Sequence, residues 1–288
     1  MTHEAEIAHD TTSPLASTIA KINGYSRHFK LHLGMPDGVG WRRASEVVTS
    51  DSWLLVQLEC LHAKHPYYPK HVVAMNFYNR YQWYLVTAGV AGFLLDARVP
   101  NLGAESIAIR LDDDGWVAGV ALLSDAFACL PDDDAVGAGS IAAFVVPDRE
   151  ALRQRLAGQV WGHMRCLIPL MQLFTPVSAH VLRAATANSL AGAALWMLQA
   201  AGRHAIAEAE SRALANALPF PTRVRFFAVE CDGERELYLD GGVCCHYYLR
   251  PDNPQGEYCA NCPKVPLTKR IAALREYMAA RQRGETLR

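Results

Sequence analysis

A dense group of cysteines near the C-terminus constrains this chain more than any other feature. Residues 241–263 read GGVCCHYYLRPDNPQGEYCANCP, in which Cys244 and Cys245 are adjacent and Cys259 and Cys262 form a Cys-x-x-Cys pair. Thiolates are soft ligands that suit zinc, copper(I) and iron–sulfur iron. Four of them complete a tetrahedral metal site or the outer positions of a two-iron cluster. We therefore expect a metal centre in this segment.

The adjacent pair bears on which metal is held. Structural zinc usually takes two Cys-x-x-Cys knuckles, because two intervening residues let one turn aim both sulfurs at one ion. The side chains of neighbouring cysteines diverge, and a cluster with two iron atoms tolerates that divergence better. His246 follows the pair and offers a Rieske-like ligand, but the four cysteines already complete the set. The residues thus favour iron–sulfur and leave zinc open.

The same residues carry a resemblance to a known family. Cys-Cys, a loop containing Tyr-Tyr and Pro, and a closing Cys-x-x-Cys-Pro resemble the C-terminal signature of the FhuF-like ferric-siderophore reductases. The resemblance implies that a [2Fe–2S] cluster is held by four ligands, Cys244, Cys245, Cys259 and Cys262. A more diffuse similarity covers residues 53–218, where the alanine-rich run 181–198 is similar to the family's central segment.

Two departures from the family pattern stand beside the ligands. The loop between the cysteine pairs, residues 246–258, has thirteen residues where the family usually has ten. We expect the surplus in residues 251–256, which read as a surface turn and can lengthen without moving the ligands. The family's basic residue before the pair is missing, since Gly241, Gly242 and Val243 stand there. The first fifty residues match nothing in the family.

The resemblance implies a cytoplasmic enzyme that reduces a ferric siderophore, often a hydroxamate chelate, by one electron and releases Fe(II). Oxygen-rich siderophores prefer Fe(III), so the reductant must have a low potential. All-cysteine plant-type clusters lie near roughly −400 mV. The sequence has no GxGxxG fingerprint and no P-loop, so the electron must come from an external donor such as a ferredoxin or a reductase.

Two other functions fit the same cysteines. One is a non-catalytic siderophore-binding or iron-binding protein in which the cluster has a structural or sensing role. The other is a zinc-stapled protein of unrelated function.

Composition excludes some classes of protein. The net charge of −1 over 288 residues gives no sign of a nucleic-acid partner. The most apolar stretch, residues 84–97, is too short to span a bilayer, and no secretory signal is visible at the start. We therefore expect no transmembrane segment and a cytoplasmic location, where Cys60, Cys129, Cys166 and Cys231 stay free.

The patterning predicts an α+β fold, with a mostly helical body containing a small β section, then a β-hairpin, a cysteine-rich segment and a terminal helix. We expect three regions: an N-terminal tail and lead-in over 1–50, the body over 51–222 and the cluster-binding region over 223–288. In the body we predict helices over 51–65 and 72–97, a hairpin over 107–123, and three helices within 148–218 with breaks at Pro169, Pro176 and Gly202. In the last region we predict a hairpin over 223–239 that turns at Asp232-Gly233, and a helix from Pro266 to Gly284.

A few further residues bear on ligand binding. His62, His65 and His71 flank a proline turn, but they lack the tight spacing of a metal site. Aromatic residues crowd the helix predicted over 72–97 and mostly read as core, although those beside a pocket suit a bulky chelate. The basic residues near the ligands form either a solvent-exposed rim or a surface that attracts an acidic electron donor or an anionic chelate. These residues are Arg250, Lys264, Lys269 and Arg270.

Overall fold

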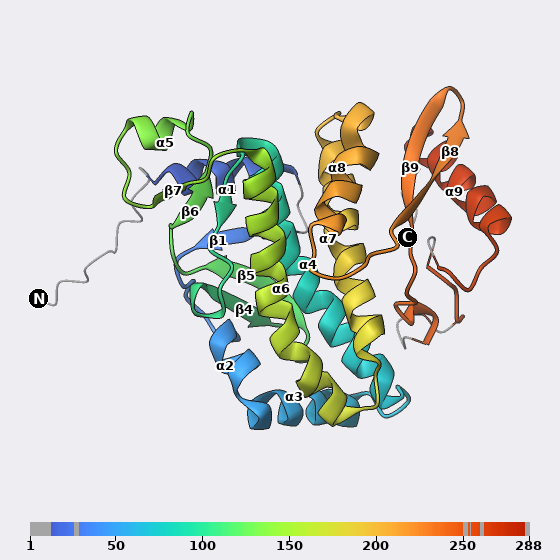
Figure 1. The fold of residues 1–288 in the computed structure, drawn as a ribbon. Helices are drawn as coiled ribbons and strands as arrows, with labels where there is room; N and C mark the ends of the chain where they lie inside the picture. Colours follow the sequence, from blue (N-terminus) through green and yellow to red (C-terminus); the bar gives the residue numbers. More distant parts are fainter. Residues whose placement is uncertain (1–12, 26–28, 250–252, 254, 260–261, 286–288) are drawn as a thin grey trace, which may run out of the picture.

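The computed structural model describes residues 13–25, 29–249, 253, 255–259 and 262–285. It has the predicted α+β fold, in which a helical body carries small sheets and a hairpin and helix close one end (Figure 1). The elements in chain order are α1 (Pro14–Tyr25), β1 (Leu31–Leu33), β2 (Trp41–Arg43), α2 (Ala44–Thr49), α3 (Asp51–Lys64), α4 (Lys70–Asp96), β3 (Val99–Pro100), η1 (Ala104–Ser106), β4 (Ile107–Leu111), β5 (Val117–Leu122), β6 (Phe127–Cys129), α5 (Asp134–Gly137), β7 (Ala143–Val145), α6 (Arg149–Phe174), α7 (Ala179–Ala200), α8 (His204–Asn216), β8 (Arg225–Cys231), β9 (Glu234–Asp240), η2 (Tyr247–Leu249) and α9 (Leu267–Gln282).

Helix α4 is the centre of the body. Its sequence is rich in apolar residues, and most of its side chains are buried, which is typical of a helix at the centre of a core. It packs against α1, α3, α6 and α7, and the side chains of Phe77, Tyr78, Tyr81 and Phe93 are fully buried. The predicted helix over 72–97 is thereby confirmed. Among the described helices, none is both long and apolar enough to cross a membrane.

A buried hydrogen-bonded chain joins α4 to α6. The imidazole Nδ1 of His163 lies 2.8 Å from the carbonyl oxygen of Leu102, and its Nε2 lies 2.5 Å from the hydroxyl of Tyr81. A carbonyl only accepts, so Nδ1–H donates to Leu102 and Nε2 accepts from Tyr81. Burial lowers the pKa of His163 from its ordinary value of 6.5, while the Leu102 hydrogen bond opposes that shift. The ring is therefore neutral in the folded protein.

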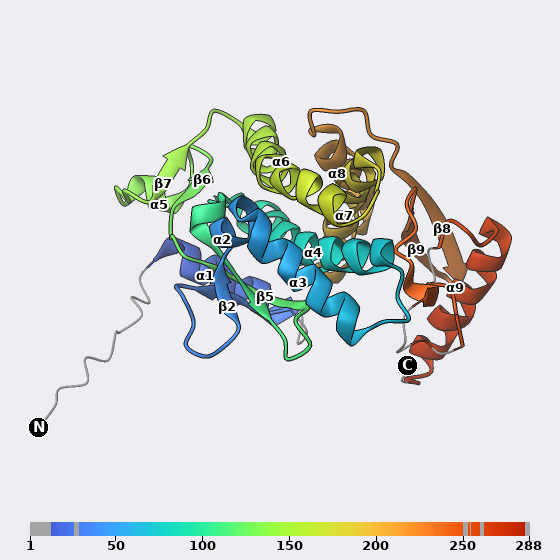
Figure 2. The same cartoon turned by 90° about the horizontal axis from the view of Figure 1, so that it is seen from below.

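The hairpin predicted over 107–123 forms the middle of a four-stranded sheet with the order β1-β5-β4-β2. The carboxylate of Asp112 accepts hydrogen bonds from the backbone N–H groups of Gly115 and Trp116 and closes the turn between β4 and β5. A second sheet has the order β3-β6-β7. The strands pack one face against the helices (Figure 2).

The alanine-rich region contains the three predicted helices, α6, α7 and α8, but one predicted break is wrong. Pro169 lies inside α6, which runs on to Phe174. Proline in a helix interior removes one hydrogen bond at a cost of about 3 kcal/mol. Here Ile168 and Leu170 on either side of it are buried in the core, and their packing holds the helix together. Gly202, with φ 70°, does follow the end of α7.

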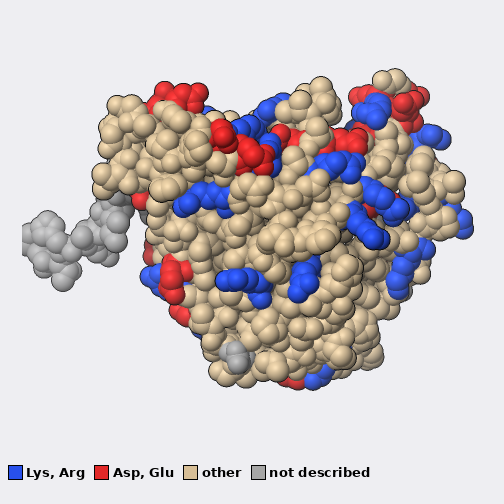
Figure 3. All heavy atoms as spheres, viewed as in Figure 1, with Lys and Arg blue, Asp and Glu red and all other residues tan. Residues whose placement is uncertain are grey.

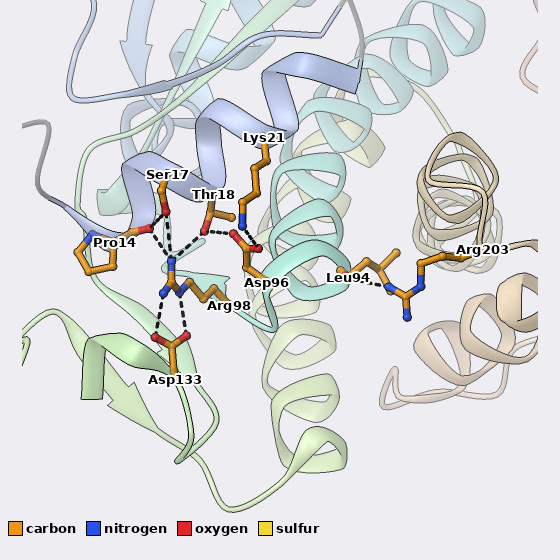
Figure 4. A network of polar contacts seen from close by, with 9 residues as sticks. All are labelled: Pro14, Ser17, Thr18, Lys21, Leu94, Asp96, Arg98, Asp133 and Arg203. Atoms are coloured by element: carbon orange, nitrogen blue, oxygen red, sulfur yellow. Dashed lines mark hydrogen bonds and ion pairs between the residues drawn. The ribbon is translucent and has the colours of Figure 1, made fainter. Parts of the chain in front are cut away.

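A polar network fastens the N-terminal helix to the end of α4 (Figure 4). The Arg98 guanidinium makes two hydrogen bonds to the Asp133 carboxylate, of 2.8 and 2.9 Å, and a third to the Pro14 carbonyl. Burial by itself raises the pKa of Asp133, but the hydrogen bonds and charge of Arg98 outweigh burial and hold it below its ordinary value. Thr18 donates to Asp96 at the last residue of α4. Residues before 51 thus contribute to the body.

The C-terminal hairpin is buried on both faces. The side chains of Phe226, Ala228 and Leu237 pack into the main core, while Val229 and Cys231 pack against α9 in a small separate core. The predicted turn is present, since Asp232 and Gly233 both have positive φ, 47° and 82°. Strands β8 and β9 therefore lie between the body and α9 (Figure 2).

We predict that Gly92→Ala destabilises the protein by about 1–3 kcal/mol, because a Cβ at this position of α4 would lie 2.6 Å from the backbone carbonyl oxygen of Arg98. Gly158→Ala on α6 is the control: no heavy atom lies within 4 Å of its Cβ, so alanine stabilises the helix by up to about 1 kcal/mol. Urea unfolding of both variants measures the difference. Equal stability of Gly92→Ala and the wild type would contradict this packing.

We also predict a pH dependence that comes from His163. Below pH about 6.5 the unfolded chain binds a proton that the folded His163 does not, so the free energy of unfolding decreases as the pH falls through that value. The loss reaches at most about 1.4 kcal/mol per pH unit for one proton. Urea unfolding from pH 7.5 to 5.5 should show a steeper fall for the wild type than for His163→Gln, which cannot titrate. Parallel curves would show that His163 is not held neutral.

Candidate metal centre

The first cysteine pair follows directly from the docked hairpin. At the end of β9, the carboxylate of Asp240 accepts a hydrogen bond of 2.8 Å from Arg270 on α9 and pairs with Arg225 on β8 at 3.1 Å. Arg270 is buried, so this ion pair is shielded from water and fixes the strand end. The chain then passes through Gly241 and Gly242 to the cysteines. The position of Cys244 thus depends on both β8 and α9.

The second pair lies just before α9. Cys259 and Cys262 form a single turn, in which the backbone N–H of Cys262 donates to the Cys259 carbonyl at 2.9 Å. The N–H of Val265 donates to the Cys262 carbonyl at 3.0 Å and leads the chain into α9. The side chain of Cys262 is buried, and those of the other three cysteines are partly buried. The two pairs are therefore attached to the two elements that pack together, the hairpin and the last helix.

The structure brings sulfur atoms from the two pairs together. The Sγ atoms of Cys245 and Cys259 lie 3.6 Å apart. Two thiolates on one tetrahedral metal with bonds of about 2.3 Å are separated by about 3.8 Å, so the distance suits two ligands of one metal atom. The backbone N–H of His246 donates to the Sγ of Cys244 at 3.4 Å, which is a contact that stabilises a thiolate. Within the described residues no three His, Cys, Asp or Glu side chains converge on one point as metal ligands.

The thiols influence one another's ionisation. The hydrogen bond between the Cys259 thiol and Cys245, burial and the charges of the nearby cysteines raise the pKa of Cys259 far above its ordinary range. Burial, followed by the charges of Cys262 and Cys245, raises the pKa of Cys244. Several thiolates in so small a volume repel each other, and a bound cation removes that penalty.

A buried asparagine organises the loop between the pairs. The amide of Asn253 donates to the carbonyls of Tyr247 and Glu257, at 3.3 and 2.6 Å, and its oxygen accepts from the N–H of Glu257. Asn253 therefore joins the two ends of the loop, although this loop is longer than the ten residues that are usual in the FhuF-like family. The sequence analysis missed this role of Asn253. Of the predicted surface turn, Pro251, Asp252 and Pro254 lie outside the described residues.

Aromatic rings cover this segment. The ring centres of Tyr248 and Tyr258 lie 4.9 Å apart with the rings tilted, and the ammonium of Lys264 lies over Tyr248 at 4.4 Å from the ring centre. The imidazole rings of His246 and His71 are in contact, with 5.1 Å between their ring centres. This contact joins the cysteine segment to the first turn of α4. Burial, with the nearby His71 and Lys264, lowers the pKa of His246. His246 therefore lies beside the cysteines as a packing residue.

The cysteine segment and α4 form the walls of an open groove of about 350 Å³. Cys245 and Tyr247 form one wall, and the other comes chiefly from one face of α4: Asn76, Asn79, Arg80, Trp83 and Tyr84. Trp83 is 37% exposed, so its ring is open to a ligand. The sequence analysis expected aromatic residues beside a pocket but did not place them next to a cysteine.

The remaining candidate residues are dispersed. His65 stacks on Trp116, away from His71, so the three histidines of the proline turn do not form one site. Among the described residues of the basic rim, Lys264 and Lys269 are exposed, and Arg270 is buried in its ion pair with Asp240. Arg250 lies outside the described residues.

Comparison of the chain with protein-family models found no match, and comparison with curated proteins found none either.

Proposed function

We propose that the chain is a ferric-siderophore reductase in which Cys244, Cys245, Cys259 and Cys262 hold a [2Fe–2S] cluster. The observation that carries the proposal is the meeting of the two cysteine pairs beside a groove that Cys245 itself lines. The reaction takes one electron from an external donor and reduces chelated Fe(III) to Fe(II). No bond of the chelator breaks, because Fe(II) is held loosely enough to leave.

The donor set suits this group. Four thiols come from two pairs, with the Sγ atoms of Cys245 and Cys259 3.6 Å apart, so Cys244, Cys245, Cys259 and Cys262 would hold the cluster. The N–H of His246 at the sulfur of Cys244 is the kind of hydrogen bond that tunes the reduction potential. When bound, a cluster of this type supplies one-electron transfer at low potential.

The groove beside Cys245 suits a weakly charged chelate. Arg80, the cation among the described residues that line it, lies 3.6 Å from the carboxylate of Asp112, so that charge is balanced. Asn76 and Asn79 offer amide groups, and Trp83 and Tyr84 offer flat apolar area. Amides and aromatic faces match the amide-like groups and aliphatic arms of a hydroxamate siderophore. We place the chelate in this groove and the reaction in the cytoplasm, where thiols stay reduced and an electron donor is at hand.

We predict that Cys259→Ser removes both the visible absorption of the cluster and the reduction of a ferric trihydroxamate such as ferrioxamine B. Serine keeps the size of the side chain but replaces the soft thiolate ligand. The measurement is anaerobic trapping of Fe(II) by ferrozine after the protein is reduced with dithionite and the excess reductant is removed.

Cys60→Ser on α3 is the matched control, since Cys60 is an exposed free cysteine on another element. It should keep the absorption and the activity. Reduction of the chelate by cluster-free Cys259→Ser would contradict the proposal. A cluster that takes up an electron but never passes it to the chelate would favour a binding or sensing role.

We predict that Trp83→Ala raises the KM for the ferric trihydroxamate by between about twofold and tenfold, because one aromatic contact contributes about 0.5–1.5 kcal/mol. The cluster spectrum should not change, since Trp83 is not a ligand. Steady-state kinetics with Tyr67→Ala as control tests this, because Tyr67 is 91% exposed and lies outside the groove. An unchanged KM would show that the chelate does not bind in this groove.

A further inference from the structure

A second cavity, of about 580 Å³, lies on another side of the cysteine segment. The first turns of α7, the linker between α8 and β8, the start of β8 and Gly242 enclose it. The linker crosses in front of α7 in Figure 1. The volume is in the range of small-molecule sites in proteins. The proposed reductase activity does not require this cavity.

The cavity has basic residues from three elements. His180 and Arg183 come from α7, Arg223 from the linker and Arg225 from β8, while no Asp or Glu is among the described residues that line it. Arg225 is balanced by Asp240 at 3.1 Å. Arg183 and Arg223 have no carboxylate within 4.0 Å in the described part of the chain. Two arginines without a carboxylate partner thus belong to the lining of one concavity.

Charge on the surrounding surface has the same sign. In Figure 3, Lys and Arg side chains spread over the middle and right of the face seen in Figure 1, and acidic side chains gather along its upper edge. A basic concavity with apolar walls concentrates the field and attracts anions. The guanidinium fork also matches the paired oxygens of a carboxylate or phosphate.

The floor of the cavity is apolar. Phe220, Pro221, Ala184 and Ala187 line it, and the Phe220 ring is held edge-on against Trp161 with 4.8 Å between ring centres. Such a floor binds the body of an organic ligand, whereas a fully hydrated inorganic ion gains nothing from it. Asn188 adds one amide group to the wall.

We propose that this cavity is a binding site for an organic anion, with an aromatic or alicyclic body on the floor formed by Phe220 and a carboxylate or phosphate between Arg183 and Arg223. The site is separate from the groove beside Cys245 and goes beyond the proposed reductase function. Gly242 is part of its wall and lies two residues before Cys244. A ligand in the cavity therefore contacts the segment that positions the first cysteine pair.

Isothermal titration calorimetry of the full chain with 2-naphthoate, 1-naphthyl phosphate and the neutral 2-naphthamide tests the proposal. At least one of the two anions should bind at least tenfold more tightly than the amide, a difference of about 1.4 kcal/mol. A preference for the phosphate or for the carboxylate identifies which oxyanion the site takes. Equal binding of the anions and the amide, or no binding of either anion, overturns the proposal.

The double variant Arg183→Gln/Arg223→Gln should weaken binding of the preferred anion at least tenfold. Arg165→Gln/Arg155→Gln on α6 removes the same charge outside the cavity and should leave binding unchanged. Arg225 is kept because its pair with Asp240 supports the hairpin. Thermal unfolding shows whether each variant is folded. Undiminished binding in a folded Arg183→Gln/Arg223→Gln overturns the proposal, whatever the outcome of the chelate-reduction assay.

Discussion

The burial of the β8–β9 hairpin on both faces is the constraint on which the candidate metal centre depends. One face packs into the main core with Phe226, Ala228 and Leu237, and the other packs against α9. The amide of Gln199 on α7 also donates to the carbonyl of Leu237 at 2.9 Å. Because each cysteine pair leaves from one of the two docked elements, packing far from the sulfurs sets the distance between the pairs.

The buried ion pair of Asp240 with Arg270 links that packing to chemistry. It joins the end of β9 to α9, and a buried ion pair fixes geometry because breaking it leaves an uncompensated charge. The cysteine segment then lies against α4 through His71 and the groove that Cys245 lines. In this arrangement the same helix that forms the centre of the core also forms a wall of the groove that Cys245 lines. The cavity of Arg183 and Arg223 includes Gly242 of the same segment in its wall.

Local signals made much of this architecture predictable. The Asp232-Gly233 turn, the Asp113-Asp114-Gly115 turn and the apolar run of α4 each act within a few residues, so they predicted the hairpins and the central helix. Pro169 shows the limit of such reasoning, because buried neighbours keep α6 intact across a residue that favours a break. The four cysteines were predicted as one group from spacing. The contacts that surround them were not: His71 meets the segment only through tertiary packing, and the hydrogen bonds of Asn253 depend on how the loop between the pairs folds.

The central claim is that the four cysteines hold a redox-active two-iron cluster, and its most direct test is analysis of protein purified without oxygen. Iron, sulfide and zinc are assayed on one sample, and the visible spectrum is recorded before and after dithionite. The account predicts about two irons and two sulfides per chain, with a red-brown colour that bleaches on reduction. A colourless protein that carries about one zinc per chain would contradict it and would make the cysteines a structural staple.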